Sequence, residues 1–265
     1  MNNYKASDLT LVICAYKECE FLEECVRSVV RQTVKPRILI STSTPNSYID
    51  KIADKYGIEV RINQDGGHVK DYNFAMRQPD TELVMLMHQD DVLRKRFVEY
   101  SLKEINKAEN PIIAFTDYVE MHDNKVDTKP SMIVTVKRIM LMPMLIKPLM
   151  RKGCFKRMIL MFGNPITHPT VICVQKHMPD ECFKEDYASL MDWDLWERLS
   201  RKKGSFVYIP KVLLYHRMNE QNQTSVLVHT SDIRCREESE MFSRFWPKCI
   251  VKIIMHFYSG AQKYY

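Results

Sequence analysis

The chain has 265 residues, of which 45% are apolar, and a net charge of +6. This length and composition allow one sizeable hydrophobic core, and they favour one α/β domain with a C-terminal extension over two equal domains. The segment Met1 to Asp8 lacks the basic and apolar parts of a secretory signal, and no stretch approaches the roughly 18 to 20 uninterrupted apolar residues of a membrane span. We therefore expect a cytoplasmic protein with one catalytic unit.

The first part of the chain predicts alternating strands and helices. Leu9 to Ala15 is a continuous apolar run, which is typical of a strand buried on both faces of a parallel sheet. In Glu18 to Gln32 the apolar residues recur at helical spacing, so a helix should follow. The next elements are a strand, a helix that ends at a glycine, and a strand: Arg37 to Thr42, Ser47 to Tyr56 before Gly57, and Glu59 to Asn63. This βαβαβ order predicts a parallel, right-handed topology.

The remainder of the chain predicts further elements of both kinds. Strands are expected at Leu83 to Met87, Ile112 to Met121 and Pro169 to Val174, and helices at Val69 to Arg77, Arg94 to Lys107 and Asp192 to Lys202. Ser131 to Phe162 predicts Met-rich helices that two prolines break. Ser205 to Ile209 and Val212 to His216 should form a strand pair across a turn at Pro210. Two amphipathic helices finish the chain, so we divide it into residues 1–230 and 231–265.

Basic residues are concentrated in one segment. Thr128 to Pro179 contains nine Lys or Arg residues and no Asp or Glu, so the remainder of the chain is net acidic. Local basicity of this kind points to an anionic surface or ligand near one region. Nucleic acid is a poor candidate partner, because Met and Leu rather than stacking aromatic residues separate the basic ones.

Several common site types are missing from the sequence. Eight cysteines are scattered along the chain without a C-x-x-C pair, so we expect reduced thiols that mostly fill the core and no structural zinc site. The sequence has no G-x-x-x-x-G-K-[ST], G-x-G-x-x-G or G-x-S-x-G motif. Any phosphates should therefore be held by a metal and side chains rather than by a glycine-rich loop.

Two carboxylates directly follow an apolar strand. Asp90 and Asp91 lie where open α/β sheets bind ligands, outside the carboxyl ends of the strands. Hard divalent cations prefer one or two carboxylates together with phosphate oxygens, so the pair could hold a metal that neutralises a diphosphate. The alternative is that one of them caps the following helix.

A second candidate is the acidic start of a predicted helix. Asp192 shares a face with Leu195 and Trp196, whereas Asp194 points roughly the opposite way. Asp192 should thus face inward, where partial burial raises the pKa of a carboxyl toward the range of a general base. The alternative role of Asp192 is an N-cap, and Asp194 is expected to be solvated or to interact with the helix dipole.

A polar tail follows the last predicted strand. His216 and Arg217 could clamp phosphates, and the polar run Gln221 to Ser225 could form a closing loop. The alternative is an ordinary loop whose polar groups are satisfied locally.

The order of these elements and motifs resembles the family-2 glycosyltransferases of the GT-A fold. The turn Ala15-Tyr16-Lys17-Glu18 is similar to the family's Thr-Tyr-Asn-Glu-like turn, and Ser28 to Thr33 is similar to its S-x-x-x-Q-T helix end. Asn63 to Asn73 is similar to the family's N-x-G…N segment. The resemblance covers about Leu9 to Ser225.

Later motifs extend the resemblance. His88 to Asp91 falls on the family's D-x-D-D motif for metal and donor, Met191-Asp192 on its E-D base motif, and Arg217 to Asn219 on its late Arg-x-His. The combination of HQDD with TSTP and DWD resembles a bacterial subgroup associated with surface polysaccharide synthesis.

The resemblance implies an α/β GT-A fold, with a Rossmann-like, mostly parallel central sheet flanked by helices. It implies inverting transfer of a sugar from a nucleotide-sugar donor to a hydroxyl of a saccharide or lipid-linked acceptor, dependent on Mn²⁺ or Mg²⁺. Asp192 is implied as the catalytic base, and Asp90 and Asp91 as metal residues. The residues implied to bind the nucleotide-sugar are Ala15, Tyr16, Glu18, Thr42, Ser43, Asn73, Gln89, Asp90 and Arg217.

Four positions depart from the family pattern. Ser41 to Pro45 replaces the acidic pair that typically contacts the nucleobase, His88 replaces the first Asp of D-x-D, Met191 replaces the Glu before the base, and Asn219 stands where a metal-contacting His is common. A catalytically degenerate domain that binds nucleotide or polysaccharide without turnover is therefore the alternative function.

The basic segment and the terminal helix Lys248 to Tyr265 raise the question of a membrane. Both could rest on an anionic leaflet, which would suit a lipid-linked acceptor. The alternative is that both pack on the sheet while their lysines extend into water. A third function, binding of polyanions through residues 128 to 179, needs neither metal nor donor.

Overall fold

The computed structural model describes residues 2–122, 124–218 and 231–261. Within these residues nine strands form one sheet in the order β3-β2-β1-β4-β8-β6-β9-β5, with β7 paired to β6. Their bounds are β1 Leu9–Ala15, β2 Arg37–Thr42, β3 Glu59–Ile62, β4 Leu83–His88, β5 Val92–Leu93, β6 Pro111–His122, β7 Lys125–Val126, β8 Val171–Val174 and β9 Ser205–Arg217. The continuous sheet is the predicted scaffold of an α/β fold.

The sheet has a parallel half and a mixed half. Strands β3, β2, β1 and β4 run parallel, as the βαβαβ order predicts. Strand β8 joins β4 and β6 antiparallel, and β6 and β9 pair with each other in parallel. β1 and β4 each have a neighbouring strand on both sides, and their side chains are buried on both faces of the sheet, which explains why their sequences are apolar runs.

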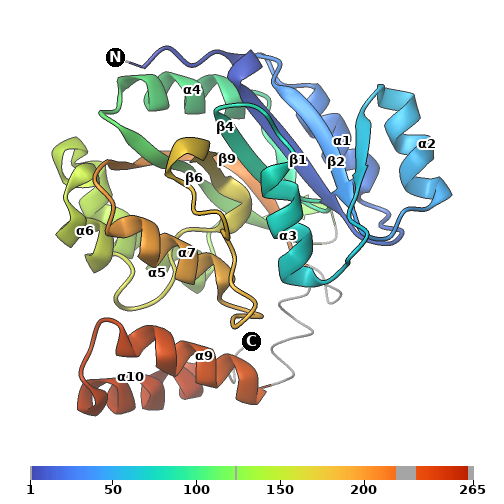
Figure 1. Ribbon diagram of the computed structural model, residues 1–265. Coiled ribbons are helices and arrows are strands. Elements are labelled where there is room, and N and C mark those ends of the chain that lie inside the picture. The colour runs from blue at the N-terminus through green and yellow to red at the C-terminus, as the bar shows by residue number, and fades with distance from the viewer. Residues whose placement is uncertain (1, 123, 219–230, 262–265) are drawn as a thin grey trace.

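Helices cover both faces of the sheet (Figure 1). The apolar faces of α1 Leu22–Val30, α2 Ser47–Tyr56 and α4 Phe97–Lys107 belong to one core cluster, and those of α3 His68–Arg77 and α7 Met191–Ser200 belong to the other. Alternate residues of β1 contribute to the two clusters, since successive side chains of a strand point to opposite faces. This Rossmann-like arrangement confirms the predicted fold class.

The boundaries of α2 follow from its capping residues. The side chain of Asn46 accepts hydrogen bonds from the backbone N–H groups of Tyr48 and Ile49. The helix ends at Gly57, which has a φ of 63° and is therefore left-handed, a conformation that glycine adopts at low cost. The predicted end of this helix is confirmed.

The predicted turn at Pro210 is wrong. Ser205 to Arg217 is one strand, and it pairs with β6 along its whole length. The register shifts at this point, because Thr116 pairs with Ile209 and the next residue, Asp117, pairs with Val212. Proline cannot donate to a strand ladder, and the irregularity accommodates Pro210 without ending the strand.

The basic segment and the C-terminus form helices outside the sheet. The segment contains α5 Met132–Leu141, the 3-10 turns Met142–Leu145 and Lys147–Arg151, and α6 Gly153–Met158. At the C-terminus, α9 Ser231–Ser243 and α10 Lys248–Ala261 lie side by side below α7 (Figure 1). Met241, Phe242 and Val251 are buried in the cluster that contains α7, so these helices pack on the protein.

Two further features bear on the sequence predictions. All eight cysteines are free thiols, and the expectation that they mostly fill the core is confirmed: Cys25, Cys173 and Cys182 are buried in it, and Cys14 and Cys19 are partly buried and pack against it. No helix in the described part of the chain is long and apolar enough to cross a bilayer. The division into residues 1–230 and 231–265 stays a prediction, because residues 219–230, including Asn219 and the polar run 221–225, lie outside the described residues.

Candidate active site

The ends of β1, β2 and β4 meet at one edge of the sheet. In the parallel register Ala15 lies beside Thr42, and Cys14 lies beside His88. Directly after β4, the Gln89 amide accepts a hydrogen bond from the Tyr16 N–H at 2.8 Å and donates to the Tyr16 carbonyl at 3.1 Å. The structure thus brings together Ala15, Tyr16, Thr42 and Gln89, at the edge where open α/β sheets bind ligands.

A carboxylate that the sequence analysis did not single out lies next to Ser43. Asp71, on the first turn of α3, accepts hydrogen bonds from the Ser43 hydroxyl and the Asn63 amide, each at 2.7 Å. Asp71 thus supplies an acidic group beside Ser41 to Pro45, the segment that lacks the family's acidic pair. Its position two residues before Asn73, within the N-x-G…N-like segment, is the sequence signal that could have indicated it.

Two of the predicted donor residues differ in their surroundings. Glu18 is exposed and lies in the turn after β1. The Asn73 amide exchanges two hydrogen bonds with the Phe183 backbone, at 2.6 and 2.9 Å, and thereby ties α3 to the segment that precedes α7. Contacts of Glu18 and Asn73 with a donor stay predictions.

A cluster of one carboxylate and two imidazoles lies beyond the end of β4. The Asp91 side chain is fully buried, and its Oδ1 accepts hydrogen bonds from His216 Nδ1 at 2.8 Å and from the Arg217 N–H at 3.0 Å. His88 Nδ1 lies 3.6 Å from Asp91 Oδ2. One ligand atom from each of His88, Asp91 and His216 lies within 4.8 Å of the other two. Antiparallel pairing of β5 with β9 brings these distant residues together.

The charges of this cluster stabilise one another. Burial alone would raise the pKa of Asp91, but His216, through its charge and hydrogen bond, and the Arg217 N–H hold that pKa below its ordinary value. Burial alone would lower the pKa of His216, but Asp91 outweighs it and raises that pKa. The pKa of His88 is lowered, mainly by burial. His216 and the Arg217 N–H therefore favour the ionised form of Asp91.

The donor set of the cluster fits a divalent cation. Asp91 Oδ2 is buried and makes no hydrogen bond within the described residues, which leaves an acceptor available. Two imidazoles and one carboxylate suit a transition metal better than Mg²⁺, which prefers oxygen ligands. The sequence identified Asp91 but not its partners: His88 was noted only as a substitution, and His216 as a phosphate clamp. Only the β5–β9 pairing reveals the group.

Asp90 and Arg217 lie next to this cluster. Asp90 is 9% exposed, and its carbonyl accepts a hydrogen bond from Arg217 Nε at 2.9 Å. The Arg217 guanidinium also donates to Glu24 at 2.6 Å and to Asn124, and it stacks 3.9 Å from the Phe21 ring centroid. Arg217 is 2% exposed and held by protein groups, so a contact with a diphosphate requires an exchange of these bonds and stays a prediction.

Asp192 lies in the first turn of α7, where its side chain is partly buried. Its carboxylate accepts hydrogen bonds from the Asn164 amide at 2.8 Å and from the Trp193 N–H at 2.7 Å. Burial nevertheless raises the pKa of Asp192 to about 6, in line with the inward orientation that the sequence predicts. A carboxylate with this pKa can accept a proton near neutral pH.

Asp192 and the β4 cluster border the same group of side chains. The pKa of the Tyr72 phenol is raised, first by burial and then by the charges of Cys14, Asp90, Asp91 and Asp192. The Tyr72 ring packs against His88 and His168, and His168 Nδ1 lies 3.4 Å from His88 Nε2. Sequence reasoning did not identify Tyr72 or His168, which lie on separate elements without a recognisable motif.

The expectation that Asp194 is solvated is wrong. Asp194 is fully buried, and its carboxylate forms ion pairs with Arg198 at 2.8 Å and with Arg244 at 2.7 Å. Arg244 directly follows α9, which covers this side of α7. The helical spacing correctly placed Asp194 away from Asp192, but packing of α9 buries what would otherwise be the outer face.

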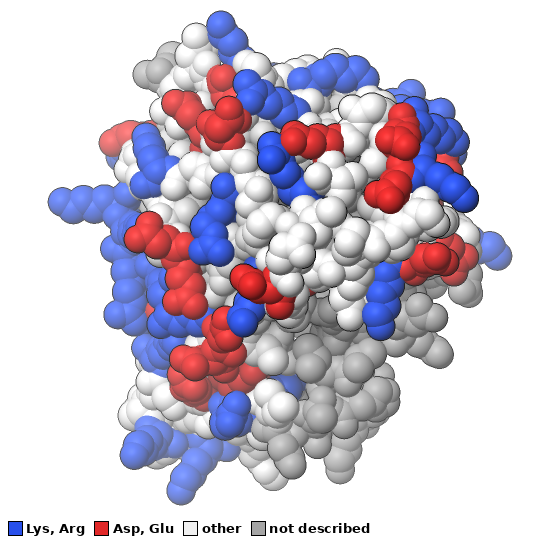
Figure 2. Space-filling view, turned by 45° about the vertical axis from the view of Figure 1, so that its right-hand side comes forward, with Lys and Arg blue, Asp and Glu red and all other residues white. Residues whose placement is uncertain are grey.

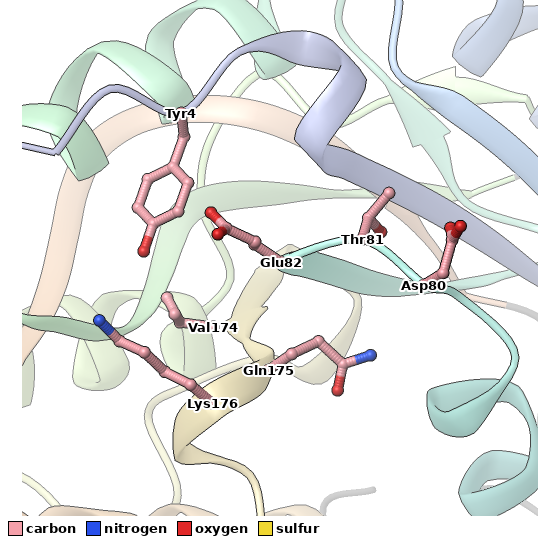
Figure 3. Close-up of a pocket in the computed structure, with 7 residues that line it drawn as sticks. All are labelled: Tyr4, Asp80, Thr81, Glu82, Val174, Gln175 and Lys176. Carbon is pink, nitrogen blue, oxygen red and sulfur yellow. The ribbon is translucent and has the colours of Figure 1, made fainter.

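A shallow pocket of about 290 Å³ lies at the other edge of the sheet (Figure 3). It is lined by Tyr4, Asp80, Thr81, Glu82, Val174, Gln175 and Lys176. These residues lie at the start of β4 and the end of β8, whereas the residues described above follow the end of β4. The pocket is therefore separate from the candidate active site.

Comparisons with known proteins agree with this geometry. The family model described as Glycosyl transferase family 2 matches residues 10–167, more than half of the chain. A teichoic acid poly(glycerol phosphate) polymerase from Staphylococcus epidermidis is 24% identical over 119 residues, which are 41% of this chain and 16% of the polymerase. The chain thus spans a small part of that relative.

Solved structures show the same fold at low sequence identity. S. aureus TarS superposes with a TM-score of 0.59 and 13% identity, over 93% of this chain and 42% of TarS. A TarS fragment in complex with UDP-GlcNAc superposes with a TM-score of 0.59 and 14% identity, over 93% of this chain and 70% of the fragment. Glucosyl-3-phosphoglycerate synthase from Mycobacterium tuberculosis superposes with a TM-score of 0.52 and 10% identity, over 89% of this chain and 79% of the synthase. The chain belongs to glycosyl transferase family 2.

Proposed function

We propose that this family-2 glycosyltransferase is an inverting enzyme of bacterial surface polysaccharide synthesis, which moves a sugar from a nucleotide-sugar donor to a hydroxyl of a saccharide or lipid-linked saccharide. The observation that carries the proposal is the Asp192 carboxyl, whose pKa is raised to about 6 and whose charge, like those of Asp90 and Asp91, raises the pKa of the partly buried Tyr72 phenol. This supports one site with the proposed base on one side and the proposed donor-binding edge on the other.

In the proposed reaction Asp192 is the general base. Its carboxylate takes the proton of the acceptor hydroxyl as that oxygen attacks the anomeric carbon, and the bond to the nucleoside diphosphate breaks. A single displacement inverts the configuration of that carbon. The hydrogen bond from Asn164 fixes the carboxylate, and partial burial keeps its pKa close to neutral pH.

The donor is proposed to bind along the ends of β1, β2 and β4. Ala15, Tyr16 and Gln89 would contact the nucleoside, and the mutual hydrogen bonds of Gln89 and Tyr16 hold this part of the site in place. Thr42, Ser43, Glu18 and Asn73 are the further proposed donor residues, with Asp71 as the acidic group beside Ser43. The complex of TarS with UDP-GlcNAc makes a uridine diphosphate sugar the first donor to test.

A divalent cation is proposed near Asp90 and Asp91, with His88 and His216 as further ligand candidates. Mn²⁺ is favoured over Mg²⁺ because of the two imidazoles. When bound, such a cation would neutralise charge on the departing diphosphate. Arg217 lies next to these residues and is proposed to approach the diphosphate after donor binding.

A screen of nucleotide-sugars for hydrolysis and transfer, with and without Mn²⁺ or Mg²⁺, tests the proposal. Turnover that requires the metal, falls steeply in Asp90→Ala and is lost in Asp192→Asn would support it. Donor binding without turnover, even with lipid-linked acceptors supplied, would favour the degenerate binding domain. Polyanion binding that needs neither metal nor donor would favour the third function. The cytoplasmic location stays a prediction, which fractionation of cells can test.

A further inference from the structure

Six large apolar side chains are exposed on α5 and the turns that follow it. We call them the α5 ridge: Met132, Val136, Ile139, Met142, Leu145 and Ile146, with exposed fractions of 83%, 49%, 59%, 58%, 53% and 56%. The first three are spaced i, i+4 and i+7, so they share one face of the helix. Val134 and Leu141, on the other side, are buried. Single exposed apolar residues are ordinary, but a contiguous group marks an interaction surface.

Exposed cations border the α5 ridge. Lys129 precedes it, and Lys147, Arg151 and Lys152 follow it, within the segment that has no acidic residue. Lys147 and Arg151 have ion-pair partners in Glu104 and Glu109 but remain 71% and 51% exposed. Lys and Arg also gather along one margin of the molecule (Figure 2). An apolar surface with a basic border is complementary to an anionic bilayer, which offers acyl chains and negative headgroups.

The opposite side of α5 contacts the candidate active site. Lys137 Nζ donates hydrogen bonds to the Tyr118 hydroxyl at 3.2 Å and to the Thr167 hydroxyl at 3.1 Å. Thr167 is three residues from Asn164, which binds the Asp192 carboxylate. The charge of Lys137 also acts to lower the pKa of Asp192, so α5 lies between the α5 ridge and the neighbourhood of the proposed base. A membrane that binds the α5 ridge would therefore lie close to Asp192, where the acceptor hydroxyl is proposed to bind.

We propose that the α5 ridge inserts into the headgroup and acyl boundary of an anionic bilayer, and that the acceptor is accordingly lipid-linked. The identity of the acceptor rests on the proposed function, whereas membrane binding does not. Apolar side chains supply most of the affinity, and the lysines around them confer the preference for anionic lipid. Peripheral attachment of this kind needs no membrane-spanning helix.

Vesicle flotation of the full chain, without donor or metal, tests the membrane proposal. The wild type should float with vesicles of phosphatidylcholine and phosphatidylglycerol, and much less with phosphatidylcholine alone. Ile139→Glu should weaken the partition coefficient by about tenfold or more, because the variant loses an inserted apolar side chain and adds a charge that the leaflet repels. Ile62→Glu, at an apolar residue of β3 that is 42% exposed, is the matched control and should bind as the wild type does.

The basic border has its own test. Lys129→Glu with Lys152→Glu should reduce binding to the anionic vesicles severalfold and remove much of its sensitivity to salt. Equal flotation of wild type and Ile139→Glu would overturn the proposal. A second outcome would also overturn the proposal. If the wild type is a dimer in sedimentation velocity, and Ile139→Glu is a monomer whose vesicle binding is unchanged, a second copy of the chain occupies the α5 ridge.

Donor hydrolysis in vesicle-free solution separates the two proposals. If Ile139→Glu hydrolyses the donor at the wild-type rate and no longer floats, the membrane proposal stands independently of the acceptor. If a water-soluble saccharide is used as efficiently as a lipid-linked one in the presence of anionic vesicles, the inferred acceptor class is wrong although the transferase function remains.

Discussion

Asp192→Asn should abolish transfer and at the same time remove an ionisation penalty from the folded protein. The pKa of this carboxyl is about 6 in the fold, compared with an ordinary value of 3.8, and the difference corresponds to about 3 kcal/mol. Because the folded pKa is raised, the stabilisation is complete below the unfolded value and is lost as pH rises through about 6. Asparagine cannot ionise, so the variant avoids this loss.

The stability lost through ionisation of Asp192 depends on pH, and this dependence distinguishes it from other effects of the substitution. The loss in the wild type should be about 3 kcal/mol at pH 8 and roughly half of that at pH 5. Partial exposure of the side chain makes these upper values, because water screens the charge. Asparagine also forfeits the hydrogen bond that one carboxylate oxygen accepts from Trp193 or Asn164, which costs about 1 kcal/mol at either pH. The change with pH isolates the ionisation.

Urea unfolding of both proteins at pH 5 and pH 8 measures this effect. The unfolding free energy of Asp192→Asn relative to the wild type should increase by up to about 1.5 kcal/mol between the two pH values. Asp194→Asn is the matched control on the same helix. It removes the buried carboxylate that pairs with Arg198 and Arg244, although Arg244 keeps Glu197 at 3.6 Å, and it should destabilise the protein by about 3 kcal/mol at pH 8.

Two results would refute this reasoning. If the stability difference between Asp192→Asn and the wild type were the same at pH 5 and pH 8, the raised pKa would be wrong. If Asp192→Asn retained turnover, the base would be another group. In the wild type, kcat/KM for transfer should decline below about pH 6, as the carboxyl becomes protonated.

Three further substitutions have defined outcomes. Glu237→Gln should lower kcat about tenfold with an unchanged donor Kd in calorimetry, because the Glu237 carboxylate accepts three backbone N–H bonds that fix the start of α7. His216→Gln should weaken Mn²⁺ binding about tenfold or more in a titration without donor. Gly204→Ala should lower the unfolding free energy by about 2 kcal/mol or more, because φ is +136° and the added Cβ would clash with the Asn110 carbonyl oxygen. The control Gly57→Ala, where the added Cβ meets open space, should lower the unfolding free energy by only about 1 kcal/mol.

The sequence predicted the parallel half of the sheet because local signals determine it. The apolar run Leu9 to Ala15 reveals a buried strand, and a capping residue and Gly57 delimit a helix without reference to the remainder of the chain. The prediction of these elements needed only short-range periodicity and capping signals. The family resemblance implied that Tyr16 and Gln89 both bind the donor, and the structure joins these two residues by two hydrogen bonds.

Other features depend on contacts between distant segments. His216 contacts Asp91 only because β9 continues past Pro210 and pairs with β5, and a proline in a strand is more readily taken for a turn. Asp194 is fully buried and pairs with Arg244, which lies 50 residues later in the chain. Neither contact leaves a pattern in the residues around the acid itself, so periodicity and motif spacing could not predict it.

The C-terminal helices, which the sequence analysis separates from the remainder of the chain, contact the residues on both sides of Asp192, the proposed base. Glu237 on α9 holds the N–H groups of Ala188, Ser189 and Leu190, the last three residues before α7. Arg244 pairs with Asp194 two residues beyond the base. Removal of α9 would leave three backbone donors and one buried carboxylate without these partners, each of which carries a desolvation cost. The start of α7, which carries Asp192, is therefore held by residues beyond 230, although the family match ends at residue 167.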